Sequence, residues 1–128
     1  MIAASWLLTI TALGQLLGYW FALPRHIADL TWPTHARFHL IQTVFWITGL
    51  YIAMLILIWQ PLQRQEQWSF WTLLALVLFA QGSYFFAVAA LPKGRPPSRG
   101  NLYDWTLSVV FLISAIGLGW MAKILGLL

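Results

Sequence analysis

The chain has 128 residues, of which 61% are hydrophobic and 8% charged, with a formal net charge of +4. Soluble domains carry roughly 25% charged residues because they need a solvated surface, so a mean hydropathy of +0.78 excludes an ordinary water-soluble domain and favours the lipid bilayer as solvent. The absence of cysteine excludes disulfides, thiolate metal sites, iron–sulfur clusters and a cysteine nucleophile. Seven basic residues scattered through apolar sequence make no basic face, which argues against nucleic-acid binding.

Four apolar stretches predict transmembrane helices, at residues 2–23, 40–59, 68–91 and 103–128. Each stretch reaches the ~20 residues that a helix needs to cross the hydrocarbon core. No internal repeat and no second domain is visible. We therefore expect an all-α, polytopic membrane protein, in which residues 1–128 form a single antiparallel bundle of four transmembrane helices.

Basic residues predict the orientation of this bundle. The loops at 24–39 and 92–102 together contain five basic residues, against two, Arg64 and Lys123, near the other helix ends. Because cytoplasmic loops are enriched in lysine and arginine, we expect both loops in the cytoplasm and both termini outside, in the cell inner membrane. Eight of the nine tryptophans fall near predicted helix ends, as an interfacial belt requires, and Trp46 is the exception.

Small residues predict where helices approach each other closely. The first predicted helix carries them at Gly14, Gly18 and Ala22, and the fourth at Ala115, Gly119, Ala122 and Gly126. Close helix packing in lipid depends on such spacing. We expect these two stripes to pack against each other within the bundle, with packing against a second protomer as the alternative.

Polar residues gather in the half of the bundle next to the two basic loops. All four predicted helices contribute: Gln15 and Tyr19, then His39, Gln42 and Thr43, then Gln81 and Tyr84, and finally Asp104 and Ser108. Polar groups inside a membrane are costly, which makes this level a candidate site. On the second helix, a single face carries His35, His39, Gln42, Thr43 and Trp46. We expect that face to look into the bundle.

The loop before the second helix has polar features of its own. Thr34 is a plausible N-cap for that helix. Arg37 opposes the helix dipole unless it is compensated, and Asp29 is the only nearby acid. An Asp29–Arg37 ion pair that folds the loop over the bundle is the simplest expectation.

One motif resembles a known family. The run Trp32-Pro33-Thr34-His35-Ala36-Arg37-Phe38-His39, followed by Gln42-Thr43, resembles the W-P-x-H-A-(K/R)-F-H-x-x-Q-T signature of an uncharacterised family of small four-helix integral membrane proteins. The resemblance implies a four-helix fold and the location of a site. It implies no reaction, because that family has no established activity.

These residues suggest a binding site, for which more than one role stays open. His35 and His39 are candidate proton donors or acceptors with Asp29 as orienter, and Arg37 is a candidate anion clamp. The other candidate ligand-binding residues are Gln15, Gln42, Gln81, Tyr84 and Asp104. The histidine pair has the spacing of a metal chelate, but histidines near a helix start more often form hydrogen bonds, so we predict no metal site.

Two of the candidate groups have structural explanations as well. Asp104 with Asn101 resembles a capping box, and the glutamines suit bonds between helices. No catalytic motif names a reaction, so enzymatic activity and cofactor stay open.

Two functions fit the sequence. The first is a small integral membrane protein whose cytoplasmic polar pocket binds or transforms a small amphipathic or lipid-like ligand. The second is an accessory structural subunit of a larger membrane complex, of respiratory or photosynthetic type, in which the chain contacts partner helices or further copies of itself.

Overall fold

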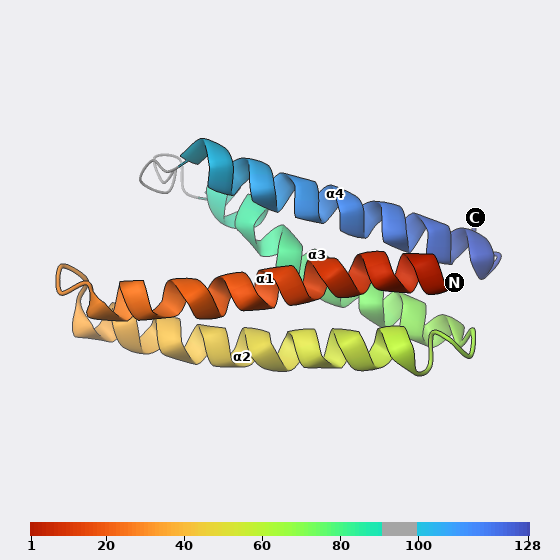
Figure 1. The fold of residues 1–128 in the computed structure, drawn as a ribbon, viewed down its shortest axis with the longest axis horizontal. Coiled ribbons are helices and arrows are strands. Elements are labelled where there is room, and N and C mark those ends of the chain that lie inside the picture. Colours follow the sequence, from red (N-terminus) through yellow and green to blue (C-terminus); the bar gives the residue numbers. More distant parts are fainter. Residues whose placement is uncertain (91–99) are drawn as a thin grey trace.

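The computed structural model describes residues 1–90 and 100–128, except for the side chains of residues 88 and 100–104. This part of the chain forms four helices, α1 (Ile2–Ala28), α2 (Thr34–Trp59), α3 (Gln67–Ala90) and α4 (Gly100–Ile124), which run antiparallel in a bundle (Figure 1). All four are long and apolar enough to cross a membrane. The predicted all-α bundle of four membrane-spanning helices is confirmed.

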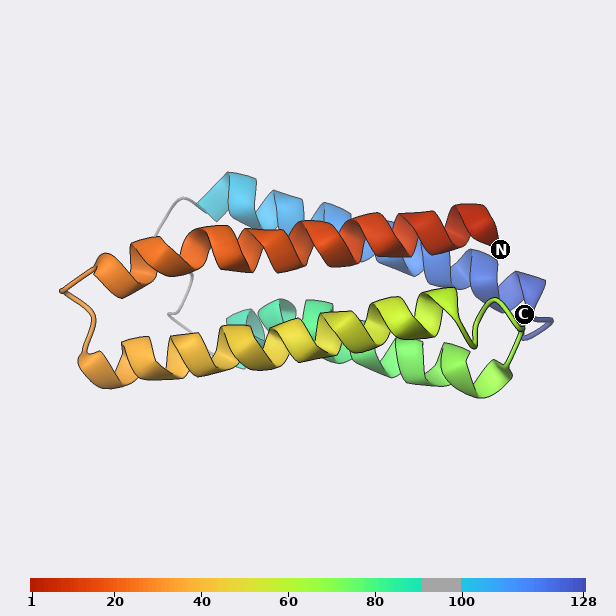
Figure 2. The same ribbon diagram turned by 60° about the horizontal axis from the view of Figure 1, so that its bottom comes forward.

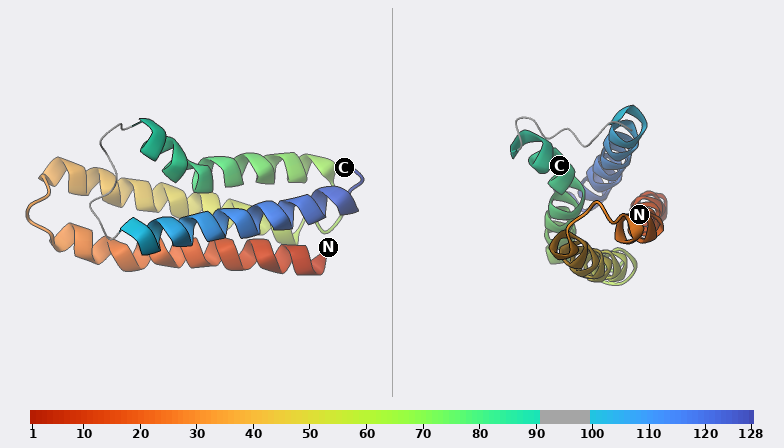
Figure 3. Two further views of the ribbon diagram at one scale, coloured as in Figure 1. Left: turned by 90° about the horizontal axis from the view of Figure 1, so that it is seen from above. Right: turned by 90° about the vertical axis from the view of Figure 1, so that its left-hand side faces the viewer.

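The helices are arranged in a ring. Successive helices contact each other, from α1 to α4, and α1 also contacts α4, which closes the ring. The end-on view in Figure 3 shows this arrangement. Both termini and the turn at residues 60–66 lie at one end of the bundle, which we call the terminal end, and the turn at residues 29–33 lies at the other, the loop end (Figure 1).

The hydrophobic core is concentrated toward the terminal end. Its most deeply buried side chains are Leu8, Tyr51, Met54, Ile58, Leu62, Leu73 and Met121. The indole of Trp59 donates to the Thr9 hydroxyl at 2.8 Å, which ties α2 to α1 there. Toward the loop end, α4 moves away from α1 (Figures 1 and 2), so the helices diverge where the polar residues gather.

The closest approach of α1 and α4 differs from the predicted one. A Cβ added at Gly117 would lie 3.0 Å from Cγ of Leu8, whereas added Cβ atoms at Gly14, Gly18 and Gly119 would meet nothing within 4 Å. The predicted seam of small residues is therefore wrong in its register. Small residues permit close approach, but one whole stripe must face the partner, and Gly14 and Gly18 are exposed instead.

The helix α3 changes direction in its second half, as its ribbon in Figure 3 shows. That half contains the pair Gly82-Ser83, and the Ser83 hydroxyl donates back to the carbonyl of Ala80 at 3.0 Å. Gly/Ser pairs and such back-bonding are common causes of helix kinks. Beyond the bend, the ring of Phe85 packs against that of Phe111 in α4, with centroids 5.4 Å apart.

The helices extend beyond the predicted apolar stretches at the loop end. Pro24 lies inside α1, and the predicted 24–39 loop shrinks to residues 29–33 between two helices. At 1.5 Å per residue, the 26 residues of α2 span about 39 Å, against about 30 Å for a hydrocarbon core. An apolar stretch marks only the part of a helix that suits hydrocarbon, whereas the backbone hydrogen bonds of a helix can continue into the interface. The apolar stretches therefore underestimated the lengths of α1 and α2.

Candidate functional site

The polar face of α2 points away from the bundle. All five residues of the face are exposed: His35, His39, Gln42, Thr43 and Trp46. The buried side chains Val44 and Tyr51 lie on the opposite side of the same helix. The prediction that this face looks into the bundle is therefore wrong. At about 39 Å, α2 is longer than the ~30 Å hydrocarbon core is thick, so the helix has length to spare for the interface, where polar side chains need no interior.

Three side chains on this face form a hydrogen-bonded chain. The Nε2 atoms of His35 and His39 lie 3.0 Å apart, with their rings nearly perpendicular at 88°. The Nδ1 atom of His39 lies 3.3 Å from Oε1 of Gln42. An amide oxygen can only accept, so Nδ1 of His39 carries a proton. The Nε2 atom of His39 then accepts from Nε2–H of His35, so the two hydrogen bonds run in the same direction along the three side chains.

The carboxylate of Asp29 organises the turn at residues 29–33. Its Oδ1 atom accepts from the Thr31 hydroxyl at 2.6 Å and from the Thr31 backbone N–H at 2.9 Å. These bonds hold the pKa of Asp29 below its usual 3.8, and the bond from the Thr31 hydroxyl has a larger effect than the bond from the backbone N–H. Desolvation raises this pKa, whereas the charges of His26 and Arg37 lower it further. Asp29 is thus an anion fixed within its own turn.

The guanidinium of Arg37 binds the end of α1. Its Nη1 donates to the carbonyl of Ile27 at 3.2 Å and its Nη2 to the Thr34 hydroxyl at 3.4 Å. Carbonyls at a helix C-terminus lack intrahelical donors and carry partial negative charge, so a cation stabilises them. The expected Asp29–Arg37 ion pair is not formed by these two described residues. Thr34 is also not the N-cap, because Pro33 occupies that position and Thr34 begins α2.

Two glutamines are buried in the interior, in contrasting states. Gln15, 7% exposed, accepts through Oε1 from the Tyr51 hydroxyl. Gln81, 2% exposed, lies on the buried face of α3 with Leu73 and Val77, and neither its Nε2 nor its Oε1 has a partner among the described residues. Buried polar groups are nearly always paired in proteins, so the amide of Gln81 is the unusual polar group in this interior.

The predicted site residues therefore fall into separate places. One group, His35, His39 and Gln42, is joined on the surface of α2. Asp29 and Arg37 stay within the turn and the adjoining helix ends, and the two buried glutamines lie in the interior. Tyr84 is half-buried with its ring 5.4 Å from that of Phe85. The side chain of Asp104 and the capping box with Asn101 lie outside the described residues, as does most of the 92–102 loop.

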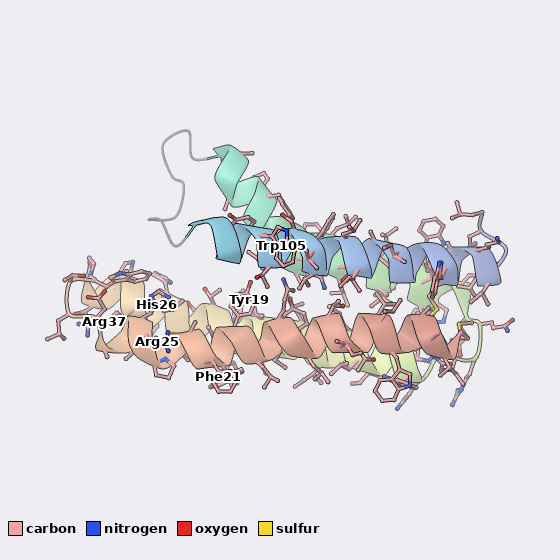
Figure 4. The ribbon with its side chains drawn as sticks, turned by 45° about the horizontal axis from the view of Figure 1, so that its top comes forward. Tyr19, Phe21, Arg25, His26, Arg37 and Trp105 are labelled. Carbon is pink, nitrogen blue, oxygen red and sulfur yellow. The ribbon has the colours of Figure 1, made fainter. Side chains whose placement is uncertain are left out.

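Figure 4 shows what surrounds the loop end. Arg25, His26 and Arg37 lie around the end of the α1–α2 hairpin, and Tyr19 rises from α1 toward α4, where Trp105 lies. Tyr19 was counted with the polar residues of this level but was not named as a ligand-binding residue, and Trp105 was predicted only as one of the interfacial tryptophans. Aromatic rings with a polar atom suit the boundary between lipid and water. This preference is the property of Trp105 from which the sequence predicts its place near the loop end.

Sequence reasoning also missed Thr31, the partner of Asp29. The signal was present in the spacing, since an aspartate followed two residues later by a threonine is typical of an Asx-turn. Among the described side chains, no group of three or more His, Asp or Glu residues is placed to hold a metal ion.

Comparison of the chain with protein-family models, with curated proteins and with solved structures found no match. The resemblance of the 32–43 motif to a family of small membrane proteins therefore stays a prediction. The chain is a multi-pass membrane protein by the length and composition of its helices. Its function has to be argued from its own side chains.

Proposed function

We propose that this membrane protein binds a small amphipathic or lipid-like ligand in the loop-end half of the bundle, with the amide of Gln81 as its polar anchor. The observation that carries the proposal is the burial of that amide without a partner among the described residues. A buried polar atom left unpaired costs about 1–3 kcal/mol. A ligand that both donates and accepts, such as a hydroxyl or carboxamide headgroup, would satisfy both atoms.

The surroundings suit a ligand with a long apolar part. The helices diverge toward the loop end (Figure 1). Tyr19 extends from α1 toward α4 there, and the aromatic ring of Trp105, 65% exposed, lies on α4 (Figure 4). Apolar and aromatic walls with few polar groups are typical of small-molecule sites. The proposal covers binding, and a reaction would need other groups, because His35 and His39 are exposed and Asp29 is held within the turn at residues 29–33, outside the interior.

The orientation is part of the same proposal. Basic residues at the loop end, among them Arg25 and Arg37, favour a cytoplasmic position for that end and an external position for both termini, in the cell inner membrane. A cysteine introduced at Gln63→Cys tests it, because the native chain has none. Labelling by a membrane-impermeant thiol reagent from outside intact cells is expected, and labelling from the cytoplasm alone would reverse the orientation.

Native mass spectrometry of the protein released from mild detergent tests ligand binding directly. The wild type is expected to carry a bound mass in addition to the polypeptide, and Gln81→Leu is expected to lose it. Gln15→Leu is the matched control, because it makes the same change at a buried glutamine that has a protein partner. Loss of the mass in both variants, or its absence from the wild type, contradicts the proposal.

A second function, that of an accessory subunit in a larger membrane complex of respiratory or photosynthetic type, is favoured by one observation. The outward face of α2 continues from Gln42 and Trp46 to the small residue Gly49, which is also exposed. Polar and small residues on an outward face favour a partner helix or a second copy of this chain. Native electrophoresis in mild detergent separates the two proposals, since a subunit migrates with partners and a ligand-binding protein migrates alone or as a small homo-oligomer.

A further inference from the structure

The two histidines of α2 present a pair of nitrogen atoms at the spacing of metal ligands. Their Nε2 atoms are 3.0 Å apart and both side chains are exposed. Residues four apart on a helix lie one above the other on the same face, so the backbone of α2 holds the pair in register. The site is therefore built into the helix and needs no change of fold to receive an ion.

The distance between the two nitrogens indicates which geometry they suit. With metal–nitrogen bonds of about 2.0–2.1 Å, two nitrogens 3.0 Å apart subtend an angle of about 95° at the metal. Adjacent ligands of a square-planar or octahedral ion subtend about 90°, and ligands of a tetrahedral ion about 109°, which would need a separation of about 3.3 Å. The pair is closer to the first geometry than to the tetrahedral geometry of zinc.

A third side chain supports this role. Metal-bound histidines usually donate the second ring N–H to an oxygen, which fixes the tautomer and leaves the other nitrogen free to bind. In this protein Nδ1 of His39 lies 3.3 Å from Oε1 of Gln42, which keeps the lone pair of His39 on Nε2. His35 becomes a ligand when its proton sits on Nδ1, a change of tautomer that alters neither its charge nor that of the site.

The sequence alone predicted no metal site here, but it did not give the distance between the two rings. From that distance we propose that His35 and His39 form a two-histidine chelate for one divalent late transition-metal ion, with Cu²⁺ bound more tightly than Ni²⁺ and Ni²⁺ more tightly than Zn²⁺. The order combines the general affinity series with the right-angle geometry, which removes the advantage zinc has at tetrahedral sites. Water fills the remaining positions, because the described side chains supply no third ligand. The site is separate from the interior proposed for the ligand, and each can fail without the other.

Titration of the purified protein tests the chelate. The full chain, purified in detergent through a tag without histidine, is titrated with CuCl₂, NiCl₂ and ZnCl₂ by calorimetry, and the copper form is examined by electron paramagnetic resonance. We expect one ion per chain and nitrogen hyperfine splitting from two imidazoles. Binding through two linked ligands exceeds binding through one by about 100-fold or more, so His35→Gln and His39→Gln should each weaken Cu²⁺ binding by that factor.

Two further variants make the result specific. His26→Gln removes the third histidine of the chain, whose ring packs on Trp32 with centroids 5.0 Å apart, and it should leave the affinity unchanged. Gln42→Ala keeps both ligands and should weaken binding about 10-fold through the loss of the outer hydrogen bond. Circular dichroism of each variant confirms that the helices are intact.

Equal weakening by His26→Gln, undiminished binding in the double variant of His35 and His39, or tighter binding of Zn²⁺ than of Cu²⁺ would each overturn the proposal. Two-nitrogen splitting that disappears in His35→Gln and in His39→Gln, and persists in His26→Gln, would establish it.

Discussion

Replacing Gln81 with leucine should stabilise the ligand-free protein. Substitutions of buried residues usually destabilise by about 0.5–3 kcal/mol, so the opposite sign is a specific expectation. It follows from the state of the amide, which is 2% exposed and has both polar atoms unpaired among the described residues. Leucine has a similar size, and it places no polar atom on the buried face of α3.

The magnitude follows from the cost of the two unpaired atoms. Each unpaired buried polar atom costs about 1–3 kcal/mol, but the unfolded chain in a membrane also finds partners, which lowers the gain. We expect Gln81→Leu to raise the free energy of unfolding by about 1–3 kcal/mol. Since 1.4 kcal/mol is a factor of ten, the folding equilibrium constant should rise by about 5- to 140-fold.

The assay is reversible unfolding in mixed micelles of dodecyl maltoside and sodium dodecyl sulfate, followed by far-ultraviolet circular dichroism after exhaustive detergent exchange. Gln15→Leu is the control for the same substitution at a paired amide. It removes the hydrogen bond from Tyr51 and should lower the free energy of unfolding by roughly 0.6–2 kcal/mol.

The two glutamine variants should therefore move in opposite directions. In protein that retains its ligand, Gln81→Leu should instead be the less stable form, because the wild type gains the binding free energy. If Gln81→Leu destabilises the ligand-free protein as much as Gln15→Leu does, then the amide of Gln81 has a partner within the protein and our argument from its burial is refuted.

Two further predictions concern packing and charge. Gly117→Val should lower the free energy of unfolding by about 1–3 kcal/mol, because a Cβ there meets Leu8 at 3.0 Å. Gly119→Val is the control, because a Cβ at Gly119 meets nothing within 4 Å. An equal effect of both variants in the same unfolding assay would contradict the close approach at Gly117. The carboxyl carbon of Asp29 should titrate below its usual 3.8 by nuclear magnetic resonance, and Thr31→Val should move that pKa upward by removing its main cause. Because the pKa of Asp29 is lowered in the folded protein, its carboxylate stabilises the turn at pH values above 3.8, and this stabilisation is lost as the pH falls through the folded pKa. An unchanged pKa of Asp29 in Thr31→Val would show that the Thr31 hydroxyl does not cause the lowered pKa.

The sequence was sufficient to predict the number of helices and their order. Runs of 20 or more apolar residues have few alternatives in a membrane, because every backbone group must be paired within its own helix. The ends of the helices were harder to predict. Pro24 and the polar residues around it were read as a loop, but interfacial water tolerates polar side chains on a helix, and α1 continues to Ala28.

The orientation of each helix about its axis could not be predicted. In a soluble bundle the apolar stripe marks the buried side, but helices in lipid are apolar all round, so Val44 and Phe45 give the same signal although one is buried and the other exposed. The small-residue stripes failed for a related reason. Gly14 and Gly117 are chemically equal as sites of close approach, and only the packing of the whole bundle selects Gly117.

The polar residues near the loop end are of two kinds, exposed ones on α2 such as His35 and His39, and a buried one on α3, Gln81. Depth was inferred from position along the apolar stretch, and on that basis His39, Gln42 and Gln81 belonged to one level and one site. His35 and His39 are exposed on the outward face of α2, so they need no partner in the interior. Gln81 has no such solvent, because it lies on the buried face of α3. The single pocket predicted from the sequence is therefore two separate places: the interior amide of Gln81, which needs a partner, and the exposed imidazoles of His35 and His39. Substitutions at one place should leave the binding properties of the other unchanged.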